Sequence, residues 1–519
     1  MAYKLPVGVQ DFAQLREGGA LYADKTELIH RLVTKGWAYF LSRSRRFGKS
    51  LIISTIKELF EGNEKLFRGL WIHNQWDWNK KHPVVRISLG TGNFRERGGT
   101  RAALSQELER EYRRHGVSYA LDAPQSQFAK LLTILSERGV RPVVLIDEYD
   151  KPVLQVLESE DNSPLLEQNR QELRAFYSCL KDAAPEFLLL TGVSRLTKAS
   201  VFSEMNHLRD ITWETGFADI CGFTRSEVET VLAEPLQELA QHRGLSVVQI
   251  VDRLQNHYNG FRFARGAATV FNPFSTLTTL ASQDFGAYWT ETGTPEFLVR
   301  LMAKSGVTLA QVDGVSLPTS ALASLDPTNP RVLPLLLQTG YLTITGHDDE
   351  NLILGFPNQE VRSAFVQHLL VVASNTGTDV VAPRAQTMGK ALIKGDLDKF
   401  LKEMQWIFGS IPYQLDDATE ARYHGLFHAM AMLACSPPGM VLAETPNALG
   451  RSDLVVDIPN ATWIFEFKRD TDSAEALEQI RHKEYARQWQ GRGKPVHTVG
   501  VTFGTEKRNI IAWDRGATV

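Results

Sequence analysis

One stretch constrains the fold of this chain more than any other, residues 40–50, FLSRSRRFGKS. The apolar run WAYFLS precedes it, and SLIISTIKELFEG, which has helical periodicity and ends on glycine, follows it. A phosphate-binding loop needs this order of strand, tight turn and helix, because the helix N-terminus must face the anion. The turn ends in Gly48, Lys49 and Ser50, as G-x-x-x-x-G-K-[ST] requires, but Arg43 stands where the first glycine is expected.

The residues of this turn suit a nucleotide. Lys49, at the lip of the loop, would reach the β- and γ-phosphates, and the Ser50 hydroxyl would ligate Mg²⁺. Arg45 and Arg46 add guanidinium groups that suit a phosphate ligand. The alternative is a surface turn that spells G-K-S by chance, and the missing glycine favours it.

A second motif, RPVVLIDEYDKP at 141–152, is an apolar strand that ends in acid. Asp147 would hold Mg²⁺ directly or through water, and Glu148 would polarise the attacking water. The alternative is a strand whose acidic end meets solvent. Together with the G-K-S turn and one strand–helix unit between them, the motif predicts ATP binding.

The next apolar strand, FLLLTGVSRL, ends in Thr191, Ser194 and Arg195. In such ATPases a polar residue here senses the γ-phosphate, and a nearby arginine stabilises the transferred charge. Ordinary loop chemistry explains the same residues equally well.

Apolar runs at 37–42, 84–89, 143–147 and 187–193 alternate with helical patterns, which predicts an α/β fold with a mostly parallel sheet. We expect a P-loop ATPase domain at 1–224, a mostly helical region at 225–385 and a second α/β domain at 386–519. Aromatic residues between 258 and 289 either stack bases or pack the joint between the first two regions.

The bulk properties limit partners and location. The net charge is −3, so a nucleic acid must be bound by local patches. The three cysteines are far apart and form no C-x-x-C, which argues against a zinc site or a disulfide framework. The chain has no run of 18 apolar residues and no apolar signal core at its start. We expect a cytoplasmic protein that does not bind membranes, and a homo-oligomer is among the alternatives.

A second candidate site lies in GRSDLVVDIPNATWIFEFKRD at 450–470, which reads as two antiparallel strands around a Pro-Asn turn. Alternation puts Glu466 and Lys468 on one face, and the turn places Asp453 opposite one of them. The two carboxylates suit Mg²⁺, with Mn²⁺ as an alternative, and Lys468 would orient or deprotonate the nucleophile. A charged hairpin face with an E-x-K salt bridge is the simpler alternative.

Residues around the hairpin extend this hypothesis. On the following helix, Gln479 and Lys483 at i, i+4 would approach the phosphate of a nucleic acid. Glu444 is a further metal ligand or a capping residue. His424 and His428 resemble a metal pair, but no glutamate stands between them in the H-E-x-x-H pattern, so a packed helix face is favoured.

Several stretches together resemble the bacterial AAA-ATPase-like family: LPVGVQDFAQLREGGALYADKTELI, RSRRFGKSL, VVLIDEYDKP, TGVSRLTKASVFSEMNHLRDIT, YNGFRF, FNPFSTL and YWTETGTPEFL. The C-terminal part resembles the PD-(D/E)xK nuclease-like domain, of the restriction-endonuclease type, that commonly follows. In that family R-x-R-R-F-G-K-S is the usual loop, so the resemblance implies ATP binding and makes Arg43 a family feature.

The favoured hypothesis is an ATP-dependent nuclease. The N-terminal module would control a Mg²⁺-dependent phosphodiesterase that acts on DNA or RNA, with defence against mobile elements as a setting. The alternative is an ATP-switched protein whose nuclease-like domain grips nucleic acid or a protein without cutting.

Overall fold

The computed structural model describes residues 3–119, 122–158, 163–196, 207–289, 296–305, 307–322, 325–374, 377–411, 419–435 and 439–518. Residues 197–206 and 290–295, which belong to two stretches quoted for the family resemblance, lie outside these ranges. The chain forms two compact units, Met1–Gly293 with Ser316–Asn358, and Thr294–Val315 with Gln359–Val519. The predicted domain boundaries at 224 and 385 stay predictions, because the boundaries of these two compact units lie at other residues.

The first unit contains a five-stranded sheet of order β2-β3-β4-β1-β5 in which every pair is parallel. Its strands are β1 Ala38–Ser42, β2 Val84–Ser88, β3 Val143–Asp147, β4 Phe187–Gly192 and β5 Arg209–Asp210. The four predicted strands and their parallel arrangement are confirmed. Every residue of β1, β3 and β4 is buried, which explains their unbroken apolar runs. Because the strands are parallel, the residues after β1, β3 and β4 meet at one edge of the sheet.

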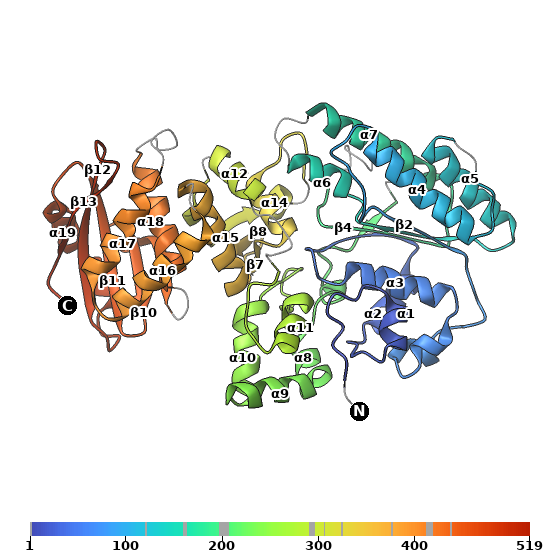
Figure 1. Cartoon of the computed structure of the whole chain (residues 1–519), viewed down its shortest axis with the longest axis horizontal. Helices are drawn as coiled ribbons and strands as arrows, with labels where there is room; N and C mark the ends of the chain where they lie inside the picture. Colours follow the sequence, from blue (N-terminus) through green and yellow to red (C-terminus); the bar gives the residue numbers. More distant parts are fainter. Residues whose placement is uncertain are drawn as a thin grey trace. The chain divides into compact units, whose positions relative to one another are not determined.

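Helices cover both faces of this sheet (Figure 1). One face carries α1 Phe12–Glu17, α2 Thr26–Lys35 and α3 Lys49–Phe60. The other carries α4 Gly99–Arg114, α5 Pro124–Glu137 and α7 Ser163–Ser178, and the short α6 Lys151–Leu157 follows β3. The result is the doubly wound layering that the alternating pattern predicts.

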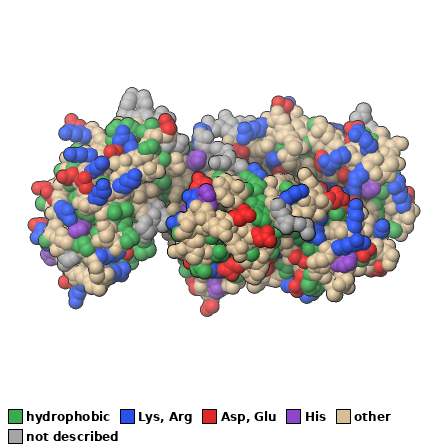
Figure 2. All heavy atoms as spheres, turned by 60° about the horizontal axis from the view of Figure 1, so that its bottom comes forward, with side chains coloured by type: hydrophobic (Ala, Val, Ile, Leu, Met, Phe, Trp, Pro, Cys, Tyr) green, Lys and Arg blue, Asp and Glu red, His purple; other side chains and the backbone are tan. Residues whose placement is uncertain are grey.

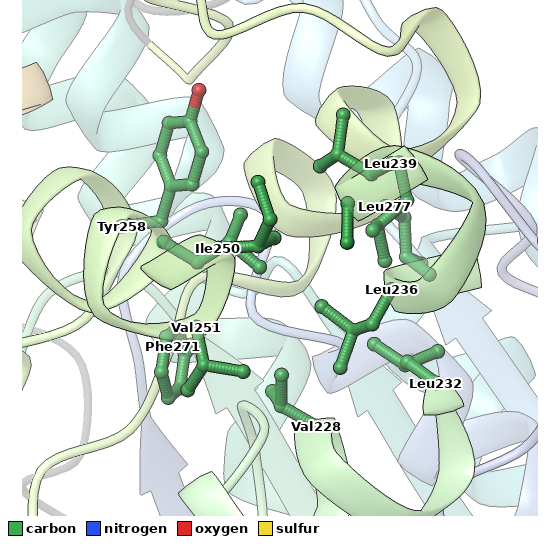
Figure 3. Close-up of a cluster of buried hydrophobic side chains, with 12 residues drawn as sticks. Val228, Leu232, Leu236, Leu239, Ile250, Val251, Tyr258, Phe271 and Leu277 are labelled. Atoms are coloured by element: carbon green, nitrogen blue, oxygen red, sulfur yellow. The ribbon is translucent and has the colours of Figure 1, made fainter. Parts of the chain in front are cut away.

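A helical cluster follows, made of α8 Arg225–Val231, α9 Ala233–Arg243, α10 Val247–Tyr258 and α11 Pro273–Ser282. Capping boxes start α8 at Thr224 and α10 at Ser246, and Gly244 ends α9 in the left-handed region. The helices point their apolar side chains into a common core (Figure 3), which includes Val228, Leu232, Leu236, Leu239, Ile250, Val251, Leu254, Tyr258, Phe271 and Leu277.

The expectation of a mostly helical middle region is confirmed, but a small sheet of order β6-β8-β7 lies within it. Its strands are β6 Val315–Pro318, β7 Thr343–His347 and β8 Asn351–Gly355, next to α13 Thr319–Leu322 and α14 Val332–Thr339. These strands have only four or five residues each, and β6 and β7 are partly exposed, so periodicity alone does not find them.

The second unit contains a mixed sheet of order β13-β12-β11-β10-β9, in which only β11 and β12 pair in parallel. Its strands are β9 Met440–Pro446, β10 Arg451–Ile458, β11 Ala461–Arg469, β12 Val496–Gly504 and β13 Asn509–Arg515. In Figure 1, α16 Thr378–Ile393, α17 Leu397–Gly409 and α18 Glu420–Cys435 lie on one face and α19 Ser473–His482 on the other. The remaining helices are α12 Glu296–Ser305 and α15 Gln359–Ser374.

Basic and acidic side chains are interspersed over the face shown in Figure 2, which agrees with the small net charge. Within the described ranges, no helix has both the length and the apolar character that a membrane crossing requires.

Candidate active sites

The phosphate loop joins β1 to α3 and does not need a glycine at its start. Among the described residues of the loop, the backbone φ is positive at Arg46 (68°) and at Gly48 (91°), but not at Arg43. Only the position next to the helix therefore uses the conformational freedom of glycine. An L-residue at position 43 fits the loop without strain.

Arg43 is a buried structural residue rather than a phosphate ligand. Its Nη1 donates to the carbonyl oxygens of Ser42 and Thr212, both at 2.8 Å, and its Nη2 to that of Phe217 at 2.9 Å. The guanidinium lies 4.4 Å from the centre of the Phe263 ring. Burial lowers the pKa of Arg43 to about 10. The side chain thus ties the loop to residues 212–217.

Lys49 is also buried, so the expectation of a lysine at the lip of the loop is wrong. Its side chain is 7% exposed, and Nζ donates to the carbonyl oxygens of Arg43 at 2.8 Å and Ser44 at 3.0 Å. Burial lowers the pKa of Lys49, and the charge of Asp147 opposes that shift. A phosphate that binds here would compete with backbone carbonyls for this ammonium group.

A cavity of about 470 Å³ brings most of the predicted nucleotide residues together. Its walls include Arg45, Arg46, Gly48, Lys49, Ser50 and Glu148. Arg45 forms an ion pair with Glu158 at 3.1 Å, and the guanidinium of Arg46 lies 4.3 Å from the centre of the Phe274 ring. The volume suits a small-molecule ligand.

The two acidic residues after β3 have different surroundings. Asp147 is buried behind the cavity wall, where its Oδ1 accepts hydrogen bonds from Thr191 Oγ1 at 2.7 Å and from the Glu148 amide at 3.0 Å. Glu148 lines the cavity with a left-handed backbone (φ 53°) and lies 3.0 Å from Lys151 Nζ. Lys151, which the sequence motif did not single out, lines the same cavity.

Ser194 and Arg195 do not line this cavity. The Ser194 hydroxyl donates to Asp150 Oδ2 at 2.6 Å, and the Arg195 guanidinium pairs with Asp210 at 2.5 Å and lies 4.6 Å from the centre of the Trp213 ring. Their roles as γ-phosphate contacts stay predictions. Asp150, missed in the sequence, is buried and also accepts from the Val193 and Ser194 amides, and burial raises its pKa.

The N-terminal segment forms a wall of the cavity that motif analysis missed. Pro6, Gly8, Val9, Tyr22 and Lys25 line it together with Phe274 and Leu277 of α11. Lys25 Nζ lies 2.7 Å from Glu227 of α8, which ties this segment to the helical cluster. The stretch LPVGVQDFAQLREGGALYADKTELI, given above for the family resemblance, was the only signal for this wall, and it contains no residue type specific for a ligand.

The aromatic residues between 258 and 289 pack against the phosphate loop. The Phe47 ring centre lies 4.7 Å from that of Phe261 and 5.2 Å from that of Phe263, both edge-on. Trp289 Nε1 donates to the carbonyl oxygen of Arg45 at 3.0 Å. These contacts support the packing interpretation rather than base stacking.

The second site lies on the β10–β11 hairpin, whose predicted Pro-Asn turn is confirmed. Ile458 pairs with Ala461 across a two-residue turn, and Leu454 pairs with Phe465. One step further, Asp453 Oδ2 accepts a hydrogen bond from the Phe467 amide at 2.8 Å, and the Asp453 amide donates to Glu466 Oε2 at 3.4 Å. The two carboxylates therefore lie side by side, as the turn predicted.

Lys468 and Gln479 complete this group. Lys468 Nζ donates to Gln479 Oε1 at 2.5 Å, and Gln479 Nε2 donates to Glu466 Oε1. Gln479 thus separates the lysine from the glutamate, unlike the direct E-x-K salt bridge of the simpler alternative. Helix α19 is held against the hairpin by a core that includes Val455, Ile464, Leu477, Ile480, Tyr485 and Trp489.

The two carboxyl groups of this site can hold a cation when both are ionised. Glu466 is 1% exposed, and burial, followed by the charge of Asp453, raises its pKa to about 8. Burial also raises the pKa of Asp453. Within the described ranges, no group of three or more His, Cys, Asp and Glu side chains is arranged to hold a metal ion. Two carboxylates fit Mg²⁺, which keeps several waters and also binds substrate phosphates.

Lys483 follows the last residue of α19 and stays one helical turn from Gln479. Helix α19 ends at His482, and Lys483 is its exposed C-cap residue, whose amide donates to the Gln479 carbonyl at 2.9 Å. Glu484 has a left-handed backbone (φ 49°), which turns Tyr485 into the core. The role of Lys483 in nucleic-acid binding stays a prediction.

The other predicted acidic and histidine residues differ in their relation to the carboxylate pair. Glu444 is exposed and pairs with Arg451 at 2.9 Å. His428 is packed in the core, where burial lowers its pKa to about 4, in agreement with a packed helix face. His424 lies 3.8 Å from Glu420, and the charges of both act on Asp453. Glu420 was not predicted, although E-x-x-x-H at the start of α18 was a usable signal.

We predict that Arg43→Gly, which restores the usual glycine pattern, weakens the protein instead of improving the site. It leaves three carbonyl oxygens without their buried donor, so we expect a loss of unfolding free energy of about 3 kcal/mol or more. Thermal unfolding and ATP titration calorimetry test this, with the exposed Arg101→Ala as control. Wild-type stability with tighter ATP binding would contradict the structural role of Arg43.

We predict that Glu466 makes stability pH-dependent when divalent metal is removed. Because its folded pKa is raised, its stabilising proton is fully present below the unfolded value and is lost as pH rises through about 8. Urea unfolding in EDTA should show stability falling between pH 5 and pH 8 by up to about 1.4 kcal/mol per pH unit. Glu466→Gln should flatten this slope, and the exposed Glu478→Gln should not. A flat wild-type profile would mean that the carboxyl is ionised throughout.

The chain is similar to two known protein families and to one relative over nearly its whole length. Residues 6–202 match the AAA-ATPase-like model, described as predicted AAA-ATPase, and residues 418–513 match the PD-(D/E)XK nuclease superfamily. A protein of Azotobacter chroococcum mcd 1, described as an uncharacterized protein in the vnfD 5'region, is 34% identical over 522 residues, 98% of each chain.

A crystal structure of Cdc6p from Pyrobaculum aerophilum matches with 12% identity over 71% of this chain and 95% of that chain. Its TM-score of 0.22 is too low to support a comparison of the two folds. The family matches and the full-length relative are sufficient: this chain belongs to the AAA-ATPase-like family of predicted AAA-ATPases and carries a PD-(D/E)XK nuclease superfamily domain.

Proposed function

We propose that this protein is an ATPase that controls a Mg²⁺-dependent nuclease of DNA or RNA. The observation that carries the proposal is the convergence of charged groups of opposite sign at two separate sites. Lys49, Ser50 and Glu148 share one cavity, and Asp453, Glu466 and Lys468 share one hairpin face. The cavity group suits a nucleoside triphosphate, and the hairpin group suits a metal ion next to a phosphodiester.

In the ATPase site, Lys49 would transfer its hydrogen bonds from the loop carbonyls to the β- and γ-phosphates. Mg²⁺ would neutralise phosphate charge there, with the Ser50 hydroxyl and the Asp147 carboxylate as its protein contacts. Glu148 would orient the attacking water after it separates from Lys151, its present partner at 3.0 Å. Ser194 and Arg195 would act from behind the cavity wall, through Asp150 and Asp210.

In the nuclease site, Asp453 and Glu466 would hold Mg²⁺, which lowers the pKa of a bound water and neutralises phosphate charge. Lys468 would orient or deprotonate the nucleophile once its bond to Gln479 is released. Gln479 would then be free to donate to a phosphate oxygen, and Lys483 would contact the backbone nearby.

Control of one site by the other requires that nucleotide binding biases a conformational equilibrium of the whole chain. The chain passes between its two units three times, after Gly293, after Val315 and after Asn358, so covalent connections for such control exist. We propose the cytoplasm as the location because all three cysteines are free, and defence against mobile elements as the setting.

The alternative is an ATP-switched binding protein whose nuclease-like domain does not cut. The hydrogen bond from Gln479 to Glu466 and the raised pKa of Glu466 favour it, because both reduce the negative charge that is free to attract a cation.

We predict that Lys49→Met and Glu148→Gln separate ATP binding from hydrolysis. Lys49→Met keeps the buried aliphatic chain but loses a charge-assisted contact worth about 1.5–3 kcal/mol, so ATP affinity should fall about 10- to 150-fold. Glu148→Gln should retain affinity and slow hydrolysis, because only the charge that polarises water is lost. Calorimetry and phosphate release test both, with the exposed Lys130→Met as control. If both variants hydrolyse ATP normally, the ATPase assignment fails.

We predict that Asp453→Asn and Glu466→Gln abolish metal-dependent cleavage and leave ATP hydrolysis nearly unchanged. Cleavage of duplex and single-stranded DNA and of RNA, with Mg²⁺ or Mn²⁺, is compared with ATP, with a non-hydrolysable analogue and without nucleotide. The exposed Glu478→Gln is the matched control. An absence of cleavage under every condition, together with retained nucleic-acid binding, would favour the non-cutting alternative.

A further inference from the structure

A strongly basic segment lies beside the hairpin site. Residues 481–494, RHKEYARQWQGRGK, comprise the last two residues of α19 and the connection to β12, and are here called the basic segment. They hold five basic residues, Arg481, Lys483, Arg487, Arg492 and Lys494, and one acidic residue, Glu484. In a chain with a net charge of −3, this local excess stands out. Arg481, Lys483, Arg487 and Arg492 are exposed, whereas Lys494 pairs with Asp457 at 2.6 Å.

The basic segment is attached to residues 447–451, which are the turn between β9 and β10 and the first residue of β10. Asn447 Nδ2 donates to the Lys483 carbonyl at 2.6 Å. Gly450 permits a close approach, because a β-carbon at this position would lie 3.0 Å from the Tyr485 hydroxyl and 3.6 Å from Lys483 Cδ. The turn and the segment therefore form one continuous surface, here called the basic surface.

An apolar side chain stands at the tip of this turn. Leu449 is 50% exposed, and both its amide and that of Gly450 donate to Asn447 Oδ1 at 2.9 Å. These two bonds fix the tip, so Leu449 stays exposed although no core covers it. Arg451, also exposed, follows directly.

The basic surface adjoins the proposed nuclease site through a shared strand and through Tyr485. Arg451 and Asp453 lie on the same strand, two residues apart, so their side chains point to the same face of the sheet. Tyr485, 2% exposed, packs under the surface, and its hydroxyl interacts with Gln479, which itself bonds to Glu466 and Lys468. A backbone held on the surface would therefore run toward the two carboxylates.

We propose that the basic surface docks the sugar–phosphate backbone of duplex DNA and that Leu449 wedges against a base step. This inference rests on the proposed nuclease function and names its substrate-binding surface. Exposed arginine and lysine suit phosphates, and an apolar wedge flanked by cations is typical of proteins that enter the minor groove. The exposed pairs Arg487–Glu484 and Arg451–Glu444 are weak enough to exchange their carboxylates for phosphates.

The test measures binding of a fluorescein-labelled DNA duplex to the full-length protein by fluorescence anisotropy over a range of salt concentrations. Every protein carries Asp453→Asn so that nothing is cut. The triple variant Arg481→Gln, Lys483→Gln, Arg487→Gln should bind about 10- to 100-fold more weakly at low salt, and its salt slope should fall by about 2 to 3. The control triple, Lys390→Gln, Lys394→Gln, Lys402→Gln, removes three exposed lysines from α16, its C-cap and α17 on the opposite face and should bind as before.

Two single variants are expected to change duplex affinity in opposite directions. Glu484→Gln removes the acidic residue of the segment, so the duplex should bind more tightly and with a steeper salt slope. Leu449→Ser should weaken duplex binding several-fold without a change in salt slope, because it removes an apolar contact and no charge.

A triple variant that binds like its parent would overturn the proposal, and so would binding of RNA alone with no affinity for duplex DNA. If the wild type never cuts but the triple variant loses duplex binding, the basic surface stands and the proposed cleavage fails. If the wild type cuts, and the triple variant made without Asp453→Asn cuts equally well and in the Asp453→Asn background binds equally well, the surface is wrong while the nuclease function stands.

Discussion

Two cations buried inside the phosphate loop decide how the N-terminal unit is built. For Arg43 and Lys49, no carboxylate lies within ion-pair distance among the described residues, so both side chains donate to backbone carbonyls, while Arg43 Nε is buried without a hydrogen-bond partner. A buried charge is costly unless it is hydrogen-bonded, which commits the carbonyls of residues 42–44 to these contacts. Neighbouring elements then close on the loop: Trp289 bonds to the Arg45 carbonyl, and the C-cap glycine of α14, Gly340, leaves no room for a β-carbon beside Ser44.

The two candidate sites carry uncompensated side-chain charges of opposite sign. The phosphate loop holds a buried ammonium group that has only carbonyl partners, and an anion would satisfy it better. The hairpin holds the buried Glu466 next to the half-buried Asp453, the pKa values of both are raised, and a cation would relieve their repulsion. Each site thus indicates the charge of its ligand, and both charges are present in a complex of Mg²⁺ with a phosphate.

Much of this arrangement could be predicted because it depends on residues close in sequence. The β1–loop–α3 unit follows from one apolar run and one amphipathic run. The placement of Asp453 on the face of Glu466 and Lys468 follows from the turn and the strand period of two, and the observed register puts it opposite Glu466. The end of α19 at His482 does not follow from local pattern, because Tyr485 beyond it turns into a core formed with strands distant in sequence. The N-terminal wall of the cavity and the burial of Lys49 were missed for the same reason, since no local pattern carries a contact between distant segments.

By itself, the sequence determined the element order, the parallel sheet, the hairpin and part of the set of residues that meet at each site. All of these depend on periodicity and turn chemistry within a few residues. Only the tertiary structure decided what those residues do there: Arg43 supports carbonyls at 212 and 217, Ser194 and Arg195 turn to Asp150 and Asp210, and Gln479 bridges Glu466 and Lys468. A side chain takes the partner that relieves its burial, and that partner comes from whichever segment the folded chain brings beside it.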